Sequence, residues 1–485
     1  MRGQSSSTEP ENRPATTKSN TKTAAGRYLA AGSIITALAA TGAGLSAQEN
    51  GGLEMTFGIR SELRATDNAE LTAPSAGDAT FFDTTLSFGL RSVTRRSKLE
   101  LDLSGVARFA DLPAGSNGSN GFEAPSARLA YVLDNQSSLL KFNANWQQTD
   151  LSYLSPINDP VLALDDAGDL VLVNDPGQRT RYSYGASIET GRTAPLGLTL
   201  AVSQNGFDYK NTLSASYYDS KRTRITGKLR LTLAPDTEAF MRVLHADFEA
   251  DNAAQTRRKN RNLSFGLTHE MDAATTIEGS IGYSKVTTDT TGGRNISDGL
   301  IAEASATRQM QNGSAGLSYE HAVYENGSRN SLKVQRDLEL PRGALSFDLG
   351  VSKSTYSDTN LIGSVTYRQG LPMGMFSLSL ARSVSTDADN QDLLATRLNA
   401  GWQYELSALS SLSLNAGLIR VENDGTGATA TRDRTNLSVA YNHALTDDWL
   451  MSTGVEVRTS QTAGQPQARS NAIFFSLERE FSIRP

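Results

Sequence analysis

Hydrophobic and polar residues alternate along most of the chain from residue 53 onward. In the first such segment, residues 53–64, apolar side chains recur at nearly every second position and mostly polar ones fill the positions between them. Because successive side chains of a β-strand point to opposite sides, a period of two predicts a strand with one apolar and one polar face. The apolar face of this segment consists of Leu53, Met55, Phe57, Ile59 and Leu63.

The same period recurs along the rest of the chain, for example in residues 99–109, 263–271 and 394–406. About 22 segments of this kind can be counted. Turn-rich links of a few residues alternate with longer polar links, among which we expect residues 150–178 and 287–297. Short turns at one end and long loops at the other are typical of membrane barrels. The pattern therefore predicts an all-β fold, a transmembrane antiparallel up-and-down β-barrel of about 20 to 22 strands.

Large aromatic residues are expected at two heights of this barrel, where their amphipathic rings suit the two membrane–water interfaces. The belt beside the short links comprises Trp402, Tyr404, Tyr441 and Trp449. The belt beside the long links comprises Trp146, Tyr182 and Tyr184.

The composition excludes several classes of protein. Hydrophobic residues make up 38% of the chain and charged residues 20%, and no apolar run after residue 47 is long enough to span a bilayer as a helix. Cysteine is absent, which excludes disulfides, thiol catalysis and cysteine-based zinc sites, and we expect neither a metal nor another cofactor. The formal net charge is −6, so the chain lacks the excess of basic residues that nucleic-acid-binding proteins carry, and no nucleic-acid partner is expected.

The first 47 residues are interpreted as a secretory signal peptide. Basic residues such as Arg13 and Arg27 precede an apolar run over residues 28–43, and small residues lead to Ala47. This is the order of regions that a cleaved signal requires, whereas the alternative, a membrane anchor, would need a longer and less glycine-diluted run. We therefore expect a signal peptide at 1–47 and a barrel at 48–485.

On this alternation and these links, the chain resembles Gram-negative outer-membrane β-barrel proteins of the porin-like kind. The resemblance covers residues 48–485 as architecture and includes no catalytic motif. It implies a location in the outer membrane, contact with outer-membrane lipid, insertion by the barrel-assembly machinery and passage of small polar solutes. One feature departs from the family: its last strand usually ends in an aromatic residue, whereas here four residues follow Phe481.

Basic residues gather in three neighbouring segments. In residues 222–230 the basic positions alternate with apolar partners such as Ile225 and Leu229, so we expect the basic ones to line the lumen, with Arg258 close to them. Fixed cations in a pore concentrate anions. The alternative is a solvated wall whose cations pair with Glu189, Asp247 or other neighbours. The predicted pore-lining cluster is Arg179, Arg181, Arg222, Arg224, Lys228 and Arg230. A further alternative is that outward cations bind lipid phosphates at the rim: Lys221, Arg257, Lys259 and Arg261.

The longest link contains two short apolar runs around an acidic, glycine-containing turn, which predicts a hairpin. Folded inward, this hairpin would constrict the pore; standing outward, it would form a surface flap. Its carboxylates do not have the spacing of a calcium-binding loop, so a solvated turn is favoured over a metal site. They are Asp159, Asp165, Asp166, Asp169 and Asp175.

These features lead us to expect a channel for passive diffusion of small hydrophilic solutes. Barrels of about 22 strands carry a plug, and only residues 48–52 separate the predicted cleavage site from the first strand. Either an inward loop fills part of the lumen, or the barrel has fewer strands than the count suggests. The alternatives are an export conduit for an extracellular polysaccharide and a surface-interaction barrel without transport. His245 and Asp247 share one side of a strand, but no nucleophile elbow or zinc signature accompanies them, and we expect no enzyme.

Overall fold

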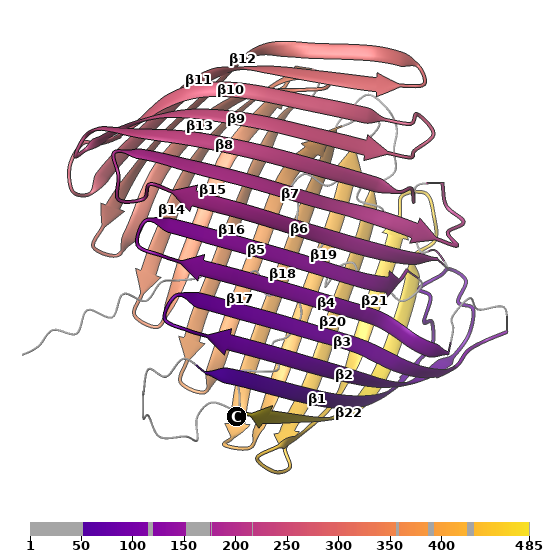
Figure 1. The fold of residues 1–485 in the computed structure, drawn as a ribbon. Coiled ribbons are helices and arrows are strands. Elements are labelled where there is room, and N and C mark those ends of the chain that lie inside the picture. Colours follow the sequence, from indigo (N-terminus) through magenta and orange to yellow (C-terminus); the bar gives the residue numbers. More distant parts are fainter. Residues whose placement is uncertain are drawn as a thin grey trace, which may run out of the picture. The chain divides into compact units, whose positions relative to one another are not determined.

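The computed structural model describes residues 52–114, 120–151, 175, 177–215, 217–355, 358–386, 392–423 and 431–484. In this part of the chain the secondary structure consists of 22 β-strands (Figure 1). No helix among these residues is long and apolar enough to cross a membrane. The expected signal peptide at 1–47 lies outside the described residues.

The strands are 12 to 18 residues long. In chain order they are β1 (Leu53–Thr66), β2 (Ala79–Val93), β3 (Ser97–Asp111), β4 (Gly121–Asp134), β5 (Ser138–Asp150), β6 (Gln178–Thr190), β7 (Leu196–Lys210), β8 (Ser220–Ala234), β9 (Thr237–Ala250), β10 (Arg257–Glu270), β11 (Thr275–Thr290), β12 (Gly293–Met310), β13 (Gly313–Tyr324), β14 (Gly327–Leu340), β15 (Gly343–Ser354), β16 (Thr359–Leu371), β17 (Gly374–Thr386), β18 (Asp392–Ser407), β19 (Ser410–Asn423), β20 (Arg432–Ala444), β21 (Trp449–Thr462) and β22 (Ala468–Ile483).

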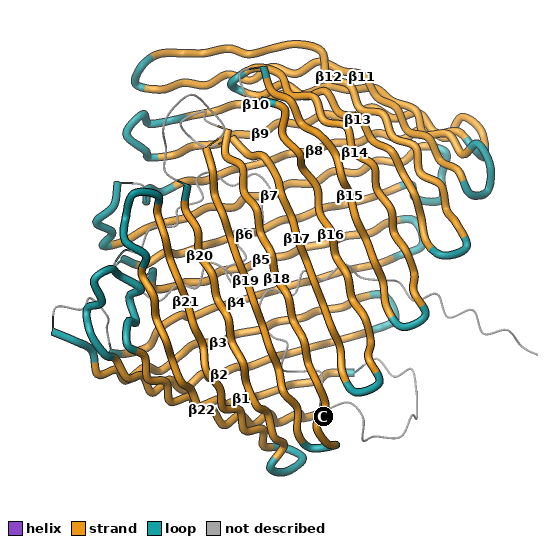
Figure 2. Tube along the Cα trace, turned by 180° about the vertical axis from the view of Figure 1, so that it is seen from behind, coloured by secondary structure: helices purple, strands orange, loops and turns teal. Residues whose placement is uncertain are grey.

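Each strand pairs antiparallel with the next along the chain, and β22 pairs with β1 (Figure 2). The closing pair runs from Met55 opposite Ile483 to Thr66 opposite Ala472. A sheet closed in this way leaves no unpaired edge, which is the condition for spanning a bilayer with strands. The predicted up-and-down barrel is confirmed, at the upper end of the expected strand number.

The two faces of each strand differ as the period of two predicts. On β10, Leu263, Phe265 and Leu267 are exposed, whereas Arg258 and Ser264 on the alternate positions are buried. The exposed apolar face is therefore the outer face of the barrel, and the other face lines the lumen. Small apolar clusters also lie on the luminal side under the links, including Phe81 with Ala69 and Ala79.

The links at the two ends of the barrel differ in length, but not everywhere. At one end, the short-link end, they span residues 94–96, 135–137, 191–195, 235–236, 271–274, 311–312, 341–342, 372–373, 408–409 and 445–448. The opposite, long-link end includes residues 67–78, 151–177 and 211–219. The expected long link at 287–297 is wrong, because only Thr291 and Gly292 separate β11 from β12. Gly293 has a φ of 129°, which favours glycine, so this glycine-rich stretch makes a tight turn.

The two expected aromatic belts lie on the outer face. Near the short links, the rings of Trp402 and Tyr404 are 5.6 Å apart, and Tyr441 follows two strands further round the sheet. Toward the long links, Trp146 lies opposite Tyr182 in the β5–β6 register. Both positions suit rings with an apolar body and a polar tip at a membrane interface.

Candidate functional site

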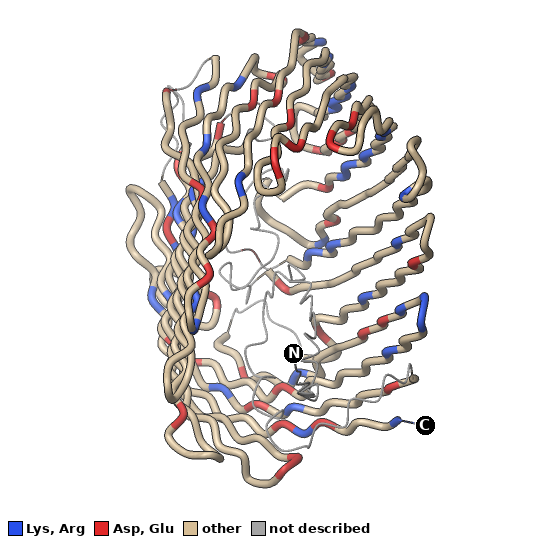
Figure 3. The backbone as a smooth tube through the Cα atoms, turned by 90° about the vertical axis from the view of Figure 1, so that its left-hand side faces the viewer, with Lys and Arg blue, Asp and Glu red and all other residues tan. Residues whose placement is uncertain are grey.

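All six residues of the predicted basic cluster lie on luminal positions of β6 and β8. On β8 the neighbouring positions carry the exposed residues Ile225, Leu229 and Leu231, so the basic positions between them face inward. Figure 3 marks the charged residues along these strands. On β6 to β10 the inward-facing carboxylates, Glu189, Glu238 and Glu270, all lie near the short-link end. The luminal side of these strands toward the long-link end is therefore predominantly basic.

The guanidinium groups of this wall lie over aromatic rings. Phe248 on β9 is directly opposite Arg222 on one side and Arg258 on the other. The two guanidinium carbons lie 5.2 Å and 5.4 Å from the centre of its ring. Arg179 lies 5.9 Å from the ring of Phe207. Such contacts are favourable because the face of the ring is electron-rich, and they hold the cations against the wall.

A second aromatic ring, Phe240 on β9, lies in the same wall nearer the short-link end. The ring of Phe240 lies 4.6 Å from the ammonium of Lys228 and 5.3 Å from the guanidinium of Arg242. It also covers Gly266 on β10, where a Cβ atom would meet the ring at 2.3 Å. Arg230 forms an ion pair of 2.8 Å with Glu238, so this cation is matched by a carboxylate.

Two ion pairs are buried on the luminal side near the long-link end. Arg258 meets Glu325, in the turn between β13 and β14, at 2.9 Å, with side chains only 9% and 5% exposed. Arg329 on β14 meets Asp392, the first residue of β18, at 2.7 Å. Asp392 also accepts a hydrogen bond of 2.8 Å from Ser354. These pairs connect strands that are not neighbours in the sheet.

The link between β7 and β8 contains a buried tyrosine. Tyr217 in this link is 8% exposed, and its ring lies 5.1 Å from that of Tyr209. Burial raises the pKa of Tyr217 to about 12, while the cationic side chain of Arg434 on β20 acts on the hydroxyl in the opposite sense. Around the closed sheet, β20 is twelve strands from β8 in one direction and ten in the other. Tyr217 is therefore influenced electrostatically by a strand that is not a neighbour of β7 or β8 in the sheet.

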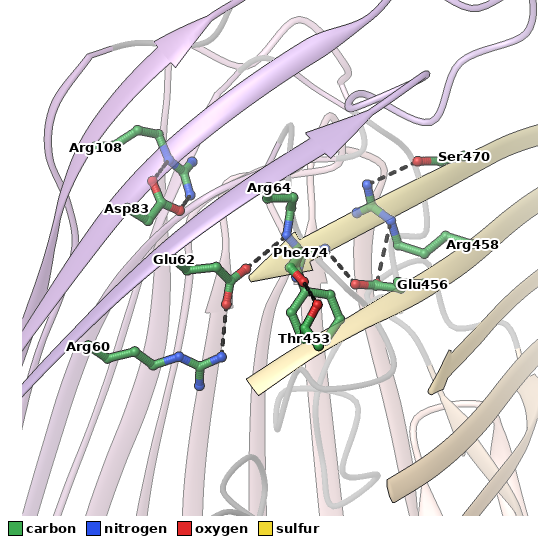
Figure 4. Close-up of polar contacts among 10 residues, drawn as sticks. All are labelled: Arg60, Glu62, Arg64, Asp83, Arg108, Thr453, Glu456, Arg458, Ser470 and Phe474. Carbon is green, nitrogen blue, oxygen red and sulfur yellow. Dashed lines mark hydrogen bonds and ion pairs between the residues drawn. The ribbon is translucent and has the colours of Figure 1, made fainter. Parts of the chain in front are cut away.

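The strands that close the barrel are joined on the luminal side by a charged network (Figure 4). Glu62 on β1 accepts hydrogen bonds from Arg60 at 2.8 Å and from Arg64 at 3.0 Å. Arg64 passes over Phe474 of β22 and reaches Glu456 of β21 at 2.5 Å. Because these contacts bridge three consecutive strands, they reinforce the backbone pairing at the closing seam.

Of the predicted constriction-loop residues, only Asp175 lies within the described residues; Asp159, Asp165, Asp166 and Asp169 lie outside them. The buried carboxylate of Asp175 accepts backbone hydrogen bonds from Leu213 at 2.9 Å and Ser214 at 2.8 Å. It thus anchors the link 211–219. His245 and Asp247 face the outer side of β9 and are 2.9 Å apart.

No pattern in the sequence pointed to a role for Glu325, Asp392 or Tyr217, or for the luminal rings Phe240 and Phe248. The carboxylates belong to a turn and a strand end distant in sequence from their partners, and no local pattern relates them. The phenylalanines carried a signal, because β9 has apolar residues at both odd and even positions. A strand with two apolar faces indicates aromatic groups in the lumen.

Comparison with known proteins identifies solved structures of the same fold, but no family model and no curated protein that match the sequence. Several solved structures share the architecture. The open form of the ferric-catecholate import receptor Fiu from E. coli K12 is 11% identical with a TM-score of 0.52, covering 90% of this chain and 82% of that chain. The FrpB iron transporter from Neisseria meningitidis is 8% identical with a TM-score of 0.53, covering 88% and 82%.

The chain is an outer-membrane β-barrel. Its closed sheet and apolar outer face place it in the outer membrane of a Gram-negative bacterium. The expectation of a passive channel is wrong, because the structures that share the fold are an import receptor and an iron transporter rather than passive porins. The polysaccharide conduit and the interaction barrel fit these neighbours no better.

Proposed function

We propose that the barrel is an import receptor that binds a small anionic iron chelate on the luminal wall of β6 to β10. The fold supports this class of function, since Fiu is a ferric-catecholate import receptor and FrpB an iron transporter. The observation that carries the proposal is the row Arg222, Phe248 and Arg258, in which Arg258 is held by Glu325 and Arg222 lies on the other side of Phe248 in the register.

The chemistry of this row matches ligands that combine negative charge with aromatic rings. Guanidinium groups donate hydrogen bonds to anionic oxygens in a planar arrangement and also stack on aromatic faces. The nearby cations Arg179, Arg181 and Arg224 add to the positive field, which draws an anion toward the wall. A ferric catecholate offers both features, with phenolate oxygens around the metal and rings at the periphery.

The link 211–219 favours binding over free passage. It is anchored at Asp175 and carries Tyr217 toward Arg434 on the far wall, so it covers part of the lumen on the side where a ligand would enter. A receptor requires such a partly closed surface, because a ligand must contact several groups at once to be retained.

Calorimetric titration of the tris-catecholate complex of Fe³⁺ into the purified protein in an uncharged detergent tests this proposal. The variant Arg222→Gln/Arg224→Gln should bind about tenfold to a hundredfold more weakly, as expected for loss of charge-assisted hydrogen bonds. Its matched control is Arg294→Gln/Arg420→Gln, which removes two outward-facing arginines and should bind within about twofold of the original protein. Equal affinities for all three proteins, or no binding to any, would overturn the proposal.

A further inference from the structure

The first half of β12 has a neighbouring strand on one side only. Residues 293–301 pair with β11, whereas the pairing with β13 runs only from Ala302 opposite His321 to Met310 opposite Gly313. Among the described residues, no other strand pairs with this half of β12. Residues 293–301 therefore form a free strand edge at the long-link end, called the β12 edge below; β11 and β12 lie at the top of the barrel in Figure 1.

The turn between β13 and β14 leaves the β12 edge because it folds toward the lumen. Glu325 in this turn forms the buried ion pair with Arg258 on the luminal face of β10. The backbone carbonyl of Glu325 also accepts a hydrogen bond of 3.0 Å from the side chain of Asn295, a luminal position of β12. Val323 on β13 is buried, and one of its methyl groups lies 3.5 Å from the position that a Cβ would take on the luminal side of Gly299. The turn thus lies on the luminal side of β12 and does not continue the sheet.

Backbone groups of alternate residues point out of the β12 edge. Only Thr291 and Gly292 separate β11 from β12, and Thr290 pairs with Gly293 across this turn. The residues that close a two-residue turn exchange backbone hydrogen bonds, and bonded and unbonded positions then alternate along the antiparallel pair. The odd-numbered residues from Gly293 to Ile301 therefore bond to β11. The residues whose amide and carbonyl groups point to the free side are Arg294, Ile296, Asp298 and Leu300.

The β12 edge fits an extended polypeptide segment rather than a lipid or a second barrel. Acyl chains cannot form hydrogen bonds with amide and carbonyl groups, so this part of β12 stands beyond the hydrocarbon of the bilayer. An added strand pairs with these groups directly. Two copies of the same edge pair antiparallel only about a two-fold axis perpendicular to the sheet. Because that axis lies in the membrane plane, it would invert one of the two barrels in the membrane.

The outer row of the β12 edge indicates which side chains its occupant carries. On the paired side, β11 places Asp289 opposite Arg294, with an ion pair of 2.5 Å, and Lys285 opposite Asp298. An added antiparallel strand meets the same row from the other side, so it is complementary when a base lies opposite Asp298 and an acid opposite Arg294. Both side chains are accessible, since that of Arg294 is 65% exposed and Asp298 is also exposed.

We propose that the β12 edge binds an extended segment of another protein by strand addition, with a basic residue of that segment opposite Asp298 and an acidic residue opposite Arg294. The long-link end is the extracellular end of such barrels, so the partner is a protein at the cell surface. The β12 edge lies outside the luminal wall of β6 to β10, and the proposal is independent of the proposed import function.

A synthetic peptide with the sequence of residues 283–290 is the probe, because this segment of β11 carries the required base and acid four residues apart. Fluorescence anisotropy measures its binding to the purified full chain in micelles of an uncharged detergent, and we expect saturable binding. The same peptide with Lys285→Asp/Asp289→Lys should bind about tenfold more weakly, because two opposite-charge pairs become like-charge pairs.

Methylation of single peptide amides tests whether the backbone pairs in the predicted register. With Lys285 of the peptide opposite Asp298, the amide of Thr287 faces the β12 edge and that of Val286 faces away from it. N-methylation at Thr287 should weaken binding about tenfold through loss of a hydrogen bond, whereas N-methylation at Val286 should change it by less than about twofold.

Variants of the barrel test the same contact from the other side. Ile296→Pro removes an amide that points to the free side and should weaken binding of the peptide about tenfold. Its matched control, Ile296→Ala, removes the side chain but keeps the amide and should lose less than about threefold. Heat-modifiable migration on gels establishes that each variant is folded, and the methylated peptides test the proposal on the original protein.

The expected pattern is selective loss with the charge-swapped peptide, with methylation at Thr287 and with Ile296→Pro. Absence of saturable binding up to millimolar peptide would overturn the proposal. Equal binding of the two charge patterns, or equal effects of methylation at the two amides, would overturn it as well.

Discussion

Arg258 and Lys259 are neighbours on β10, yet they lie in opposite physical settings. Arg258 faces the lumen, is buried, stacks on Phe248 and pairs with Glu325 at 2.9 Å. Lys259 faces outward, is exposed, and forms no ion pair with a described residue. One residue step along a strand therefore separates a buried, paired cation from an exposed one.

The largest expected effect comes from removing the inner cation. Arg258→Ala leaves Glu325 buried without its partner, and breaking a buried pair in this way costs about 3–5 kcal/mol. Lys259→Ala on the adjacent position removes a solvated charge and should change stability by less than about 0.5 kcal/mol. Urea unfolding of the two variants in detergent micelles measures both. Similar losses in the two variants would contradict the distinction between the faces.

A lysine placed on either face of β10 gives a second, smaller contrast. Leu267 is 52% exposed toward lipid, and Leu267→Lys should destabilise the barrel by about 2–4 kcal/mol. Thr268 faces the lumen and donates a hydrogen bond of 3.2 Å to Glu278, so the ammonium of Thr268→Lys has a carboxylate within reach.

The measurement is the unfolding free energy of both lysine variants in lipid vesicles. We expect the variant at position 268 to lose less than about 1 kcal/mol. If that variant loses as much as the variant at position 267, the assignment of inner and outer faces on this strand is incorrect.

The period of two in the sequence predicted the faces of most strands, because lipid on one side and water on the other impose opposite demands on alternate residues. It was ambiguous for β9, where Phe240 and Phe248 face inward while Met241 and Val243 face outward. The ambiguity has a physical cause: this part of the lumen is lined by aromatic rings beneath cations, so both faces are partly apolar.

The partners of the luminal arginines were beyond reach of the sequence pattern. Glu325 and Asp392 meet Arg258 and Arg329 only because the sheet closes, which brings together strands that do not pair. The passive-channel expectation was wrong for a related reason. Alternation predicts the two faces of the barrel wall, but it does not distinguish one class of transport barrel from another, and no local pattern indicated that Tyr217 is buried.

The smallest expected effect concerns the pH dependence of stability that arises from the buried Tyr217. Burial raises the pKa of Tyr217 to about 12, so the folded protein holds the phenolic proton more tightly than the unfolded chain, which releases it near pH 10. The stabilisation is therefore fully present below pH 10 and is lost as the pH rises toward 12, by about 2 kcal/mol at most. Unfolding free energies between pH 9 and pH 12 should fall more steeply for the original protein than for Tyr217→Phe. The variant Tyr184→Phe, which removes an exposed phenol, should follow the original protein.

Because Arg434 favours the phenolate, Arg434→Gln should move the titration of Tyr217, followed by absorbance at 295 nm, to still higher pH. An unchanged titration would mean that link 211–219 does not hold Tyr217 near the opposite wall, and the mouth would then be open on that side.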